Sequence, residues 1–425
     1  MGDNYIGEVK VKLLTFLGLG QYYLTRYVWD GKTFDARFAP LASIHFLKPT
    51  QIFVFLTEEA EAQVFPAFQE ALPPDLPIEP RRIPLGENSA ELWDIFTIVA
   101  DSVQEGDEIA FDITHGLRSF PYLALLAAAY LRAAMHVQVR AVVYGAFDVR
   151  DQSTTPNRAP LFDLSPMLNL LEWASATDRF NRTGDARYLA SLLRDQQKQL
   201  AKRWQEEPER LHQLSALNNL AGSLQEISQT LRLIRPHQTM QAVDGLPQRI
   251  EAAKPVLQKA AAARPFTRLL DNLLQTYQPL SLPNATAPAQ QRQALQTERH
   301  MLAWYAEREL WVQTVALGRE WLVSWVMAHL GIVPETSSAE RHRVEGFINT
   351  EAEAFLQAKK ESRPFVPIFL REVPEVETML SLWKSLTNIR NDILHAGMRD
   401  NPKPPHTLLQ NIRKALETIE KLPLP

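Results

Sequence analysis

The pattern of apolar residues changes once along this chain, and that change constrains the fold more than any other feature. Up to about residue 165, apolar runs typical of strands occur at 11–18, 23–29, 51–57, 78–85, 108–114 and 137–149. Helical periods lie between them, at 87–103 and in the Ala/Leu-rich segment 123–132. Strands that alternate with helices predict an open, largely parallel sheet.

Beyond residue 165 the sequence predicts helices and no strand. Segments 185–207 and 212–234 have the apolar period of amphipathic helices, and a break rich in Pro, Ala and Asn follows at 282–291. A last helical block covers 295–425. We therefore predict an α/β plus all-α protein with an α/β domain at 1–165, a helical connecting domain at 166–294 and a helical domain at 295–425.

Composition excludes several classes of function. The formal net charge of the 425 residues is −4, so a polyanion would have to be bound by a local basic patch. The absence of cysteine excludes disulfides, thiolate metal sites and cysteine nucleophiles, and it fits a reducing cytoplasm. No signal-peptide pattern occurs, and the longest apolar run ends at Arg132, too short to cross a bilayer. We expect a cytoplasmic protein without a membrane partner.

Two predicted strand ends carry polar and glycine residues. Ligands of open α/β sheets bind at the carboxyl ends of the strands. The first strand runs into FLGLGQYY, which places Gly18, Gly20, Gln21 and Tyr22 at this edge. Glycines there allow a ligand to approach the backbone, and their N–H groups can bind phosphate; a plain tight turn is the alternative. Thr57, at the end of strand 51–57, offers a further donor.

A third strand end reads DITHGLRSFP and predicts an anion site. Gly116 suits the turn, and Ser119 with Pro121 suits the start of a helix. The free N–H groups of that helix would favour a phosphodiester. The side chains that add donors are Thr114, His115 and Arg118.

The same segment also allows two other interpretations. Asp112 and His115 could simply brace the turn through hydrogen bonds to the backbone. Catalysis by His115 is less favoured than ligand binding, because no partner base or nucleophile stands beside it in sequence.

A second candidate site lies in SLWKSLTNIRNDILHAGM, residues 381–398. The apolar period predicts a helix, with Gly397 at its C-cap and with Arg390, Asn391 and His395 near its end. Asn391 and His395 are four apart and share a face, whereas Arg390 and His395 are separated by about 140° around the helix. Two such helices related by a two-fold axis could bring two Arg and two His side chains to one groove.

These residue types suit RNA cleavage without a metal. Histidine can move the 2′-hydroxyl proton or protonate the leaving 5′-oxygen. Arginine can hold the scissile phosphate and stabilise its developing charge, and asparagine can orient the histidine or the backbone. The alternative is structural, since the helix dipole favours a histidine in the last turn.

Taken together, FLGLGQYY, DITHGLRSFP and RNDILH resemble the CRISPR-associated DxTHG-motif family, the CARF–HEPN ribonucleases of type III CRISPR systems. Residues 164–186 are similar to that family's junction between the Rossmann-like domain and the helical region. The resemblance implies that 1–165 is a CARF domain and 295–425 a HEPN ribonuclease domain.

The resemblance further implies a homodimer, or a higher oligomer, that binds a cyclic oligoadenylate, with cyclic tetra-adenylate favoured. Occupancy would activate cleavage of single-stranded RNA, without a metal or other cofactor, to leave 2′,3′-cyclic phosphate ends. By motif, the catalytic residues would be Arg390, Asn391 and His395. The ligand-binding residues would be Gly18, Gly20, Gln21, Tyr22, Thr57, Thr114, His115, Gly116 and Arg118.

Three alternatives stay open on the sequence. The chain could be a sensor that binds a cyclic nucleotide and acts through a non-catalytic helical module. The first domain could also degrade its own activator, which no residue decides. A DNase has little support, because Glu8-Val-Lys10 lacks an acidic partner on a preceding strand.

Overall fold

The computed structural model describes residues 10–116, 120–260, 263–333, 338–398 and 401–425. The chain forms two compact units, Met1–Leu171 and Glu172–Pro425. The boundary predicted at 165 falls at the first residue of helix α6 (Ser165–Thr183), close to the division between the units. Both predicted helical domains lie in the second unit, so their separation at residue 294, inside α13 (Gln291–Glu307), stays a prediction.

The first unit is built on an eight-stranded sheet in the order β3-β2-β8-β7-β6-β1-β4-β5. Five neighbouring pairs are parallel, and the pairs β2–β3 and β7–β8 are antiparallel, which confirms the largely parallel sheet that was predicted. The strands are β1 (Val11–Leu17), β2 (Thr25–Trp29), β3 (Lys32–Ala36), β4 (Gln51–Leu56), β5 (Ile78–Arg82), β6 (Glu108–Asp112), β7 (Gln138–Gly145) and β8 (Asn157–Asp163).

Two of these strands were not predicted. β3 reads KTFDA and exposes most of its residues, so it lacks the apolar alternation of a half-buried strand. β8 contains Pro160, and proline within a run argues against a strand. Both segments form strands through hydrogen bonds to neighbouring strands, because β3 pairs with β2 and β8 pairs with β2 and β7.

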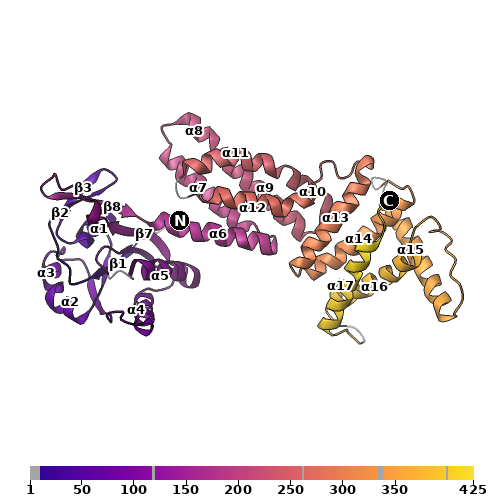
Figure 1. The fold of residues 1–425 in the computed structure, drawn as a ribbon, viewed down its shortest axis with the longest axis horizontal. Helices are drawn as coiled ribbons and strands as arrows, with labels where there is room; N and C mark the ends of the chain where they lie inside the picture. The colour runs from indigo at the N-terminus through magenta and orange to yellow at the C-terminus, as the bar shows by residue number, and fades with distance from the viewer. Residues whose placement is uncertain (1–9, 117–119, 261–262, 334–337, 399–400) are drawn as a thin grey trace, which may run out of the picture. The chain divides into compact units, whose positions relative to one another are not determined.

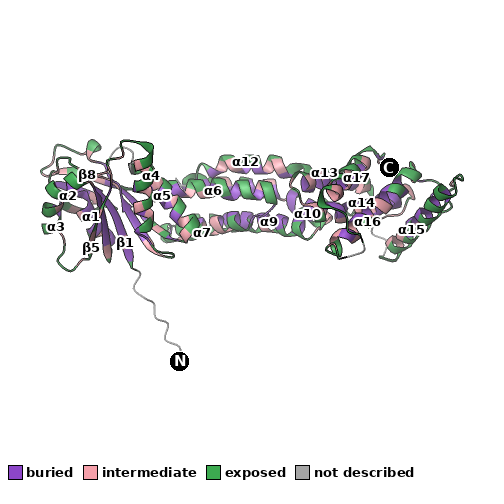
Figure 2. Cartoon of the chain, turned by 90° about the horizontal axis from the view of Figure 1, so that it is seen from below, coloured by how far each residue is buried: buried purple, intermediate pink, exposed green. Residues whose placement is uncertain are grey.

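Helices cover both faces of this sheet, because its strands point alternate side chains to opposite sides. Leu13 of β1 and Val54 of β4 pack with residues of the first three helices, whereas Leu14 and Phe55 pack with the next two. The central strands β1, β4 and β6 are therefore buried on both faces while the helices keep an exposed side (Figures 1 and 2). The helices are α1 (Ala39–Leu47), α2 (Glu58–Gln63), α3 (Phe65–Glu70), α4 (Ser89–Asp101) and α5 (Phe120–Met135), with a 3₁₀ turn η1 at Phe147–Val149.

The second unit is helical, and its described residues contain no strand, as predicted. None of the described helices combines the length and apolar character that crossing a membrane requires. After α6 the elements are α7 (Arg187–Arg203), α8 (Pro208–Gln213), α9 (Ser215–Arg232), α10 (Pro236–Asp244), α11 (Leu246–Lys259), α12 (Phe266–Tyr277), η2 (Gln278–Leu280), η3 (Pro288–Gln290), α13, α14 (Trp311–His329), α15 (Ser338–Lys360), α16 (Val376–Leu394) and α17 (Pro405–Lys421).

Large aromatic side chains fill the core of this unit, and most of their buried polar atoms find partners, the indole nitrogen of Trp304 being an exception. Trp321, Trp325 and Trp383 are almost completely buried. The hydroxyl of Tyr277 donates to the carbonyl of Phe180 at 2.8 Å. Such bonds remove the cost of burying a phenol without a partner, so the aromatic rings can contribute their full apolar area.

Candidate functional site

The structure brings together the loops that follow β1 and β6. These strands are parallel neighbours, so their carboxyl ends meet at one edge of the sheet. In the strand order, β2 lies on one side of β1 and β4 on the other, and ligands of open α/β sheets bind at such a switch in strand order. The rings of Tyr22 and His115 meet edge to face, with centroids 4.6 Å apart. Gly18 lies so close that a Cβ there would be 3.1 Å from the carbonyl oxygen of His115. The segments FLGLGQYY and DITHG therefore form one site.

Tyr22 closes the first loop on itself. Its hydroxyl accepts from the N–H of Gly18 at 3.1 Å and donates to the Gly18 carbonyl at 2.6 Å. Burial raises the pKa of Tyr22 to about 12. The N–H of Gly18 therefore already has a partner within the loop, and its proposed contact with a phosphate stays a prediction. Gly18 also allows the close approach to His115.

His115 is held as a neutral imidazole. Its Nε2 accepts from the N–H of Ala39, the first residue of α1, at 3.1 Å. Burial lowers the pKa of His115 to about 4. Because Nε2 accepts, we assign the ring proton to Nδ1, which can donate to a ligand. The side chain therefore serves as a helix cap and a donor, and it is poorly suited to act as a base at neutral pH.

Asp112 braces this loop, as the alternative interpretation expected. Its carboxylate accepts from the hydroxyl of Ser43 on α1 at 2.5 Å and from the N–H of Thr114 at 3.0 Å. Asp112 is completely buried, and that burial raises the pKa of its carboxyl group. Thr114 in turn accepts from the N–H of Gly145 at 2.8 Å, and its side chain also hydrogen-bonds with the Asp112 carboxylate.

A cavity of about 180 Å³ opens beside this loop. Four predicted residues contribute to its wall, namely Gln21, Tyr22, Thr114 and His115. The sequence did not single out its remaining lining residues, which are Tyr23, Thr25, Tyr27, Arg37, Tyr144, Gly145, Phe147 and Asp148.

Two of those additional residues form a flat aromatic pair. The rings of Tyr23 and Phe147 are stacked, with centroids 5.8 Å apart and planes 5° from parallel. Arg37, the cation that lines the cavity, donates to the carbonyl of Tyr22 at 3.3 Å. Nucleotide-binding sites commonly combine aromatic rings, which stack with bases, with a guanidinium and other donors, which bind phosphates.

Among the described residues, Gly18, Gly20, Thr57 and Gly116 are predicted ligand residues that do not line this cavity. Thr57 is the N-cap of α2, where its hydroxyl oxygen accepts from the N–H of Ala60 at 3.3 Å. Gly20 is exposed and has open space around it. Gly116 follows His115 in the turn. Arg118 and the predicted helix cap Ser119 lie outside the described residues.

The second candidate site lies where α16 ends. The helix terminates at Leu394 with His395 as its C-cap, and Ala396 takes the left-handed conformation with φ of 51°. The N–H of Gly397 donates to the carbonyl of Asp392 at 3.2 Å, and that of Ala396 to Ile393 at 3.0 Å. This pair of bonds is a Schellman motif, so Gly397 lies two residues beyond the C-cap rather than at it.

Arg390 and Asn391 are neighbours on α16, and His395 follows as the C-cap, with its backbone N–H donating to the carbonyl of Asn391 at 3.0 Å. The Arg390 guanidinium donates to the amide oxygen of Asn391 at 3.4 Å, a long bond. Arg390 also lines a small apolar hollow of about 40 Å³ against α14, with Val312, Val315, Ala316, Ile393 and Leu394. His395 is exposed. The convergence of Arg390 and His395 across two chains, which their spacing indicated, stays a prediction.

Asp392 is a structural residue that the sequence did not single out. It is buried, and its carboxylate accepts from the N–H of Lys403 at 3.2 Å. Asp392 thus ties the segment after His395 back to α16. The sequence does show an aspartate inside the RNDILH motif. Whether its side chain is buried or exposed depends on where the helix ends, which the sequence alone does not fix.

Comparison with known proteins gives matches to CRISPR-associated proteins. Residues 169–281 match the family described as CRISPR-associated protein MJ1674, second domain. This match covers α7 to α12 and most of α6. It therefore concerns the helical region whose role the motifs left undefined.

Individual proteins were also found. CRISPR-associated protein MJ1674 of Methanocaldococcus jannaschii is 29% identical over 157 residues, which is 36% of this chain and 23% of that protein's length. The structure of Enterococcus italicus Csm6 bound to cyclic hexa-2'-fluoro-hexa-dAMP aligns with 97% of this chain and 93% of its own, at 12% identity and a TM-score of 0.45. The family match and the M. jannaschii relative confirm that this chain is related to the CRISPR-associated proteins, as its motifs predict.

Proposed function

We propose that this chain is a single-strand endoribonuclease that a cyclic oligoadenylate activates and that needs no metal ion. The observation that carries the proposal is the cavity at the ends of β1 and β6, where hydrogen-bond donors stand beside a stacked aromatic pair. The RNDILH motif at the end of α16 supplies the proposed catalytic residues.

The cavity has the groups that an adenine nucleotide needs. The Nδ1 proton of His115 can donate to a phosphate oxygen, and Arg37 adds a positive charge at the wall. The Arg150 guanidinium lies 4.0 Å from the centre of the Phe147 ring, so the face of Tyr23 that does not meet Phe147 is the one proposed to stack with a base, which contributes about 1–3 kcal/mol per base.

The size of the cavity favours a ligand shared between two chains. About 180 Å³ lies below the range of about 300–1,000 Å³ that holds a drug-sized molecule. A cyclic oligonucleotide is larger still, so one chain would hold one part of the ring and a second copy the symmetric part. A homodimer is therefore part of the proposal.

The proposed chemistry also requires two copies. Arg390 and His395 would lie about 140° apart around an ideal helix, so we propose that one chain presents its arginine and the other its histidine at the same phosphate. In that arrangement His395 accepts the 2′-hydroxyl proton, and the 2′-oxygen attacks phosphorus. The 5′-oxygen leaves and takes up a proton, and a 2′,3′-cyclic phosphate remains. Arg390 stabilises the charge on the phosphoryl oxygens.

The experiment combines the purified protein, a fluorescent RNA and EDTA with cyclic tri-, tetra-, penta- or hexa-adenylate in turn. We expect one ring size, with cyclic tetra-adenylate favoured, to turn on cleavage in the presence of EDTA. Cleavage that EDTA abolishes would contradict the proposed chemistry. Binding of a ring without any cleavage would instead support a sensor with a non-catalytic helical module.

A further inference from the structure

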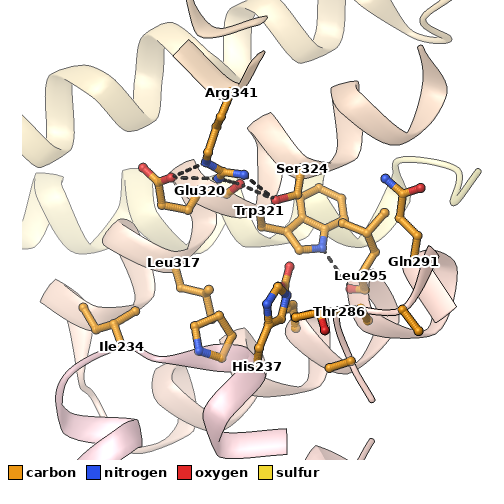
Figure 3. Close-up of a pocket in the computed structure, with 15 residues that line it drawn as sticks. Ile234, His237, Thr286, Gln291, Leu295, Leu317, Glu320, Trp321, Ser324 and Arg341 are labelled. Carbon is orange, nitrogen blue, oxygen red and sulfur yellow. Dashed lines mark hydrogen bonds and ion pairs between the residues drawn. The ribbon is translucent and has the colours of Figure 1, made fainter. Parts of the chain in front are cut away.

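We propose that the second unit contains a binding site for a small organic cation, meaning a protonated amine or amidine on an apolar body. The site is a cavity of about 260 Å³ between the start of α10 and helices α13, α14 and α15 (Figure 3). It belongs to neither candidate site described above, and the proposal does not depend on the nuclease function.

The cavity has an apolar, buried floor and an open polar rim. Leu295, Leu317 and Trp321 form much of the floor and are at most 2% exposed. The indole N–H of Trp321 donates to the carbonyl of Leu295 at 2.9 Å, so it does not need a hydrogen-bond acceptor from a ligand (Figure 3). His237 and Gln291 are partly exposed at the rim. This arrangement suits a compact apolar body that enters from the rim.

Glu298 on α13 gives the cavity a preference for a positively charged ligand. Its side chain is 6% exposed, and its polar partner among the described residues is Nε2 of His237, at 3.5 Å. A carboxylate can accept about four hydrogen bonds, so most of its capacity is unused. Burial of a charge without compensation is costly, and a ligand that brings a positive charge would remove that cost.

The other charged residues of the wall are already paired, which excludes an anionic ligand. Arg341 donates to the Glu320 carboxylate at 2.7 Å and to the Ser324 hydroxyl at 3.0 Å, as Figure 3 shows. The second carboxylate oxygen of Glu320 accepts from Arg319 at 3.0 Å. Among the charged residues that line the cavity, Glu298 is therefore the one left for a ligand to neutralise.

A metal ion is a poorer occupant than an organic cation. The cavity offers one carboxylate and one imidazole at short range, and the described residues contain no group of three His, Cys, Asp or Glu that could hold a metal. The apolar floor would also give a hydrated ion no contact, whereas an organic cation would bury its apolar body there.

Benzamidine is a suitable probe because it joins a flat apolar ring to an amidinium, and benzamide is its neutral counterpart. Binding to the full chain can be measured by calorimetry and by saturation-transfer NMR. We expect benzamidine to bind and benzamide to bind at least about tenfold more weakly, because a hydrogen bond to a charged group is worth more than a neutral one.

Two variants and a control locate the site. Glu298→Gln should weaken benzamidine binding about tenfold or more, and Glu353→Gln, an exposed residue on α15, should leave it unchanged. His237→Ala keeps the carboxylate and removes its competing partner, so it should bind benzamidine at least as tightly as the wild type. This partly exposed position provides the test if Glu298→Gln fails to fold.

Three results would overturn the proposal. They are no benzamidine binding at millimolar concentration, equal binding of benzamide, and loss of binding in His237→Ala while that variant remains folded. RNA cleavage is not a readout here, so failure of the nuclease proposal would leave the result interpretable.

Discussion

Replacement of Asp112 by alanine should destabilise the first unit strongly. The carboxylate accepts from the hydroxyl of Ser43, which is fully buried, and from the N–H of Thr114. Asp112→Ala leaves both donors without a partner. A buried donor left unsatisfied costs about 1–3 kcal/mol, so the expected loss in free energy of unfolding is about 2–6 kcal/mol.

The loss should depend on pH. Burial raises the pKa of Asp112 in the folded chain above its unfolded value. The stability that such a group contributes is complete below the unfolded pKa, about 4, and is lost as pH rises through the folded pKa. The deficit of Asp112→Ala should therefore be largest in acid and shrink toward neutral pH.

Hydrogen exchange read by mass spectrometry on the full chain can follow β1 and β6 separately from the helical unit. Urea unfolding at about pH 5 and pH 8 tests the pH dependence. The matched control is Asp101→Ala, an exposed position at the end of α4 where a change within about 0.5 kcal/mol is expected. Equal protection of β6 in the two variants would refute the bracing role.

Three further predictions concern other parts of the chain. His115 has its pKa lowered from 6.5 to about 4, so its contribution is present above pH 6.5 and lost as pH falls through about 4; His115→Gln should remove that part of the acid sensitivity of unfolding, up to about 3 kcal/mol. Tyr23→Ala should weaken binding of the activating cyclic oligoadenylate by about 1–3 kcal/mol in calorimetry, whereas Tyr130→Ala on α5 should not. Gly184 has φ of 69°, and a Cβ there would lie 2.7 Å from a buried indole, so Gly184→Ala should lower stability by about 1–3 kcal/mol in calorimetric unfolding; Gly222→Ala, within α9 and free of contacts, should not lower it.

Much of the fold follows from apolar periodicity. Apolar runs identified β1, β4 and β6, and a helical period placed Ile95 and Val99 of α4 on one face, which the structure buries. The same reasoning missed β3 and β8, whose residues become strands through pairing with β2 and β7. Local patterns do not specify such long-range pairings.

The candidate site likewise contains residues that local sequence patterns predicted and residues that they missed. Thr114 and His115 were recognised because they follow a strand directly, and the structure places both in the cavity wall. Phe147 was missed because it meets Tyr23 only through the arrangement of β2, β7 and β8 in the sheet. Similarly, the bond between His115 and the start of α1 joins residues 76 positions apart, which no local motif could reveal.

Leu394 shows a further limit of periodicity. The apolar period of 382–394 predicted it on the buried face, yet it is 58% exposed beside Arg390. The helix ends at this residue, so the packing that buries Leu382 and Leu386 does not extend to it.

The central claim is that His395 cleaves RNA when the activator binds. The most direct test measures RNA cleavage by the wild type, His395→Ala and His406→Ala, with activator binding measured on the same samples. His406 is an exposed histidine on α17 and serves as the matched control. We expect His395→Ala to lose cleavage by about a hundredfold or more while it binds the activator normally, and His406→Ala to behave as the wild type. Undiminished cleavage by His395→Ala would contradict the account.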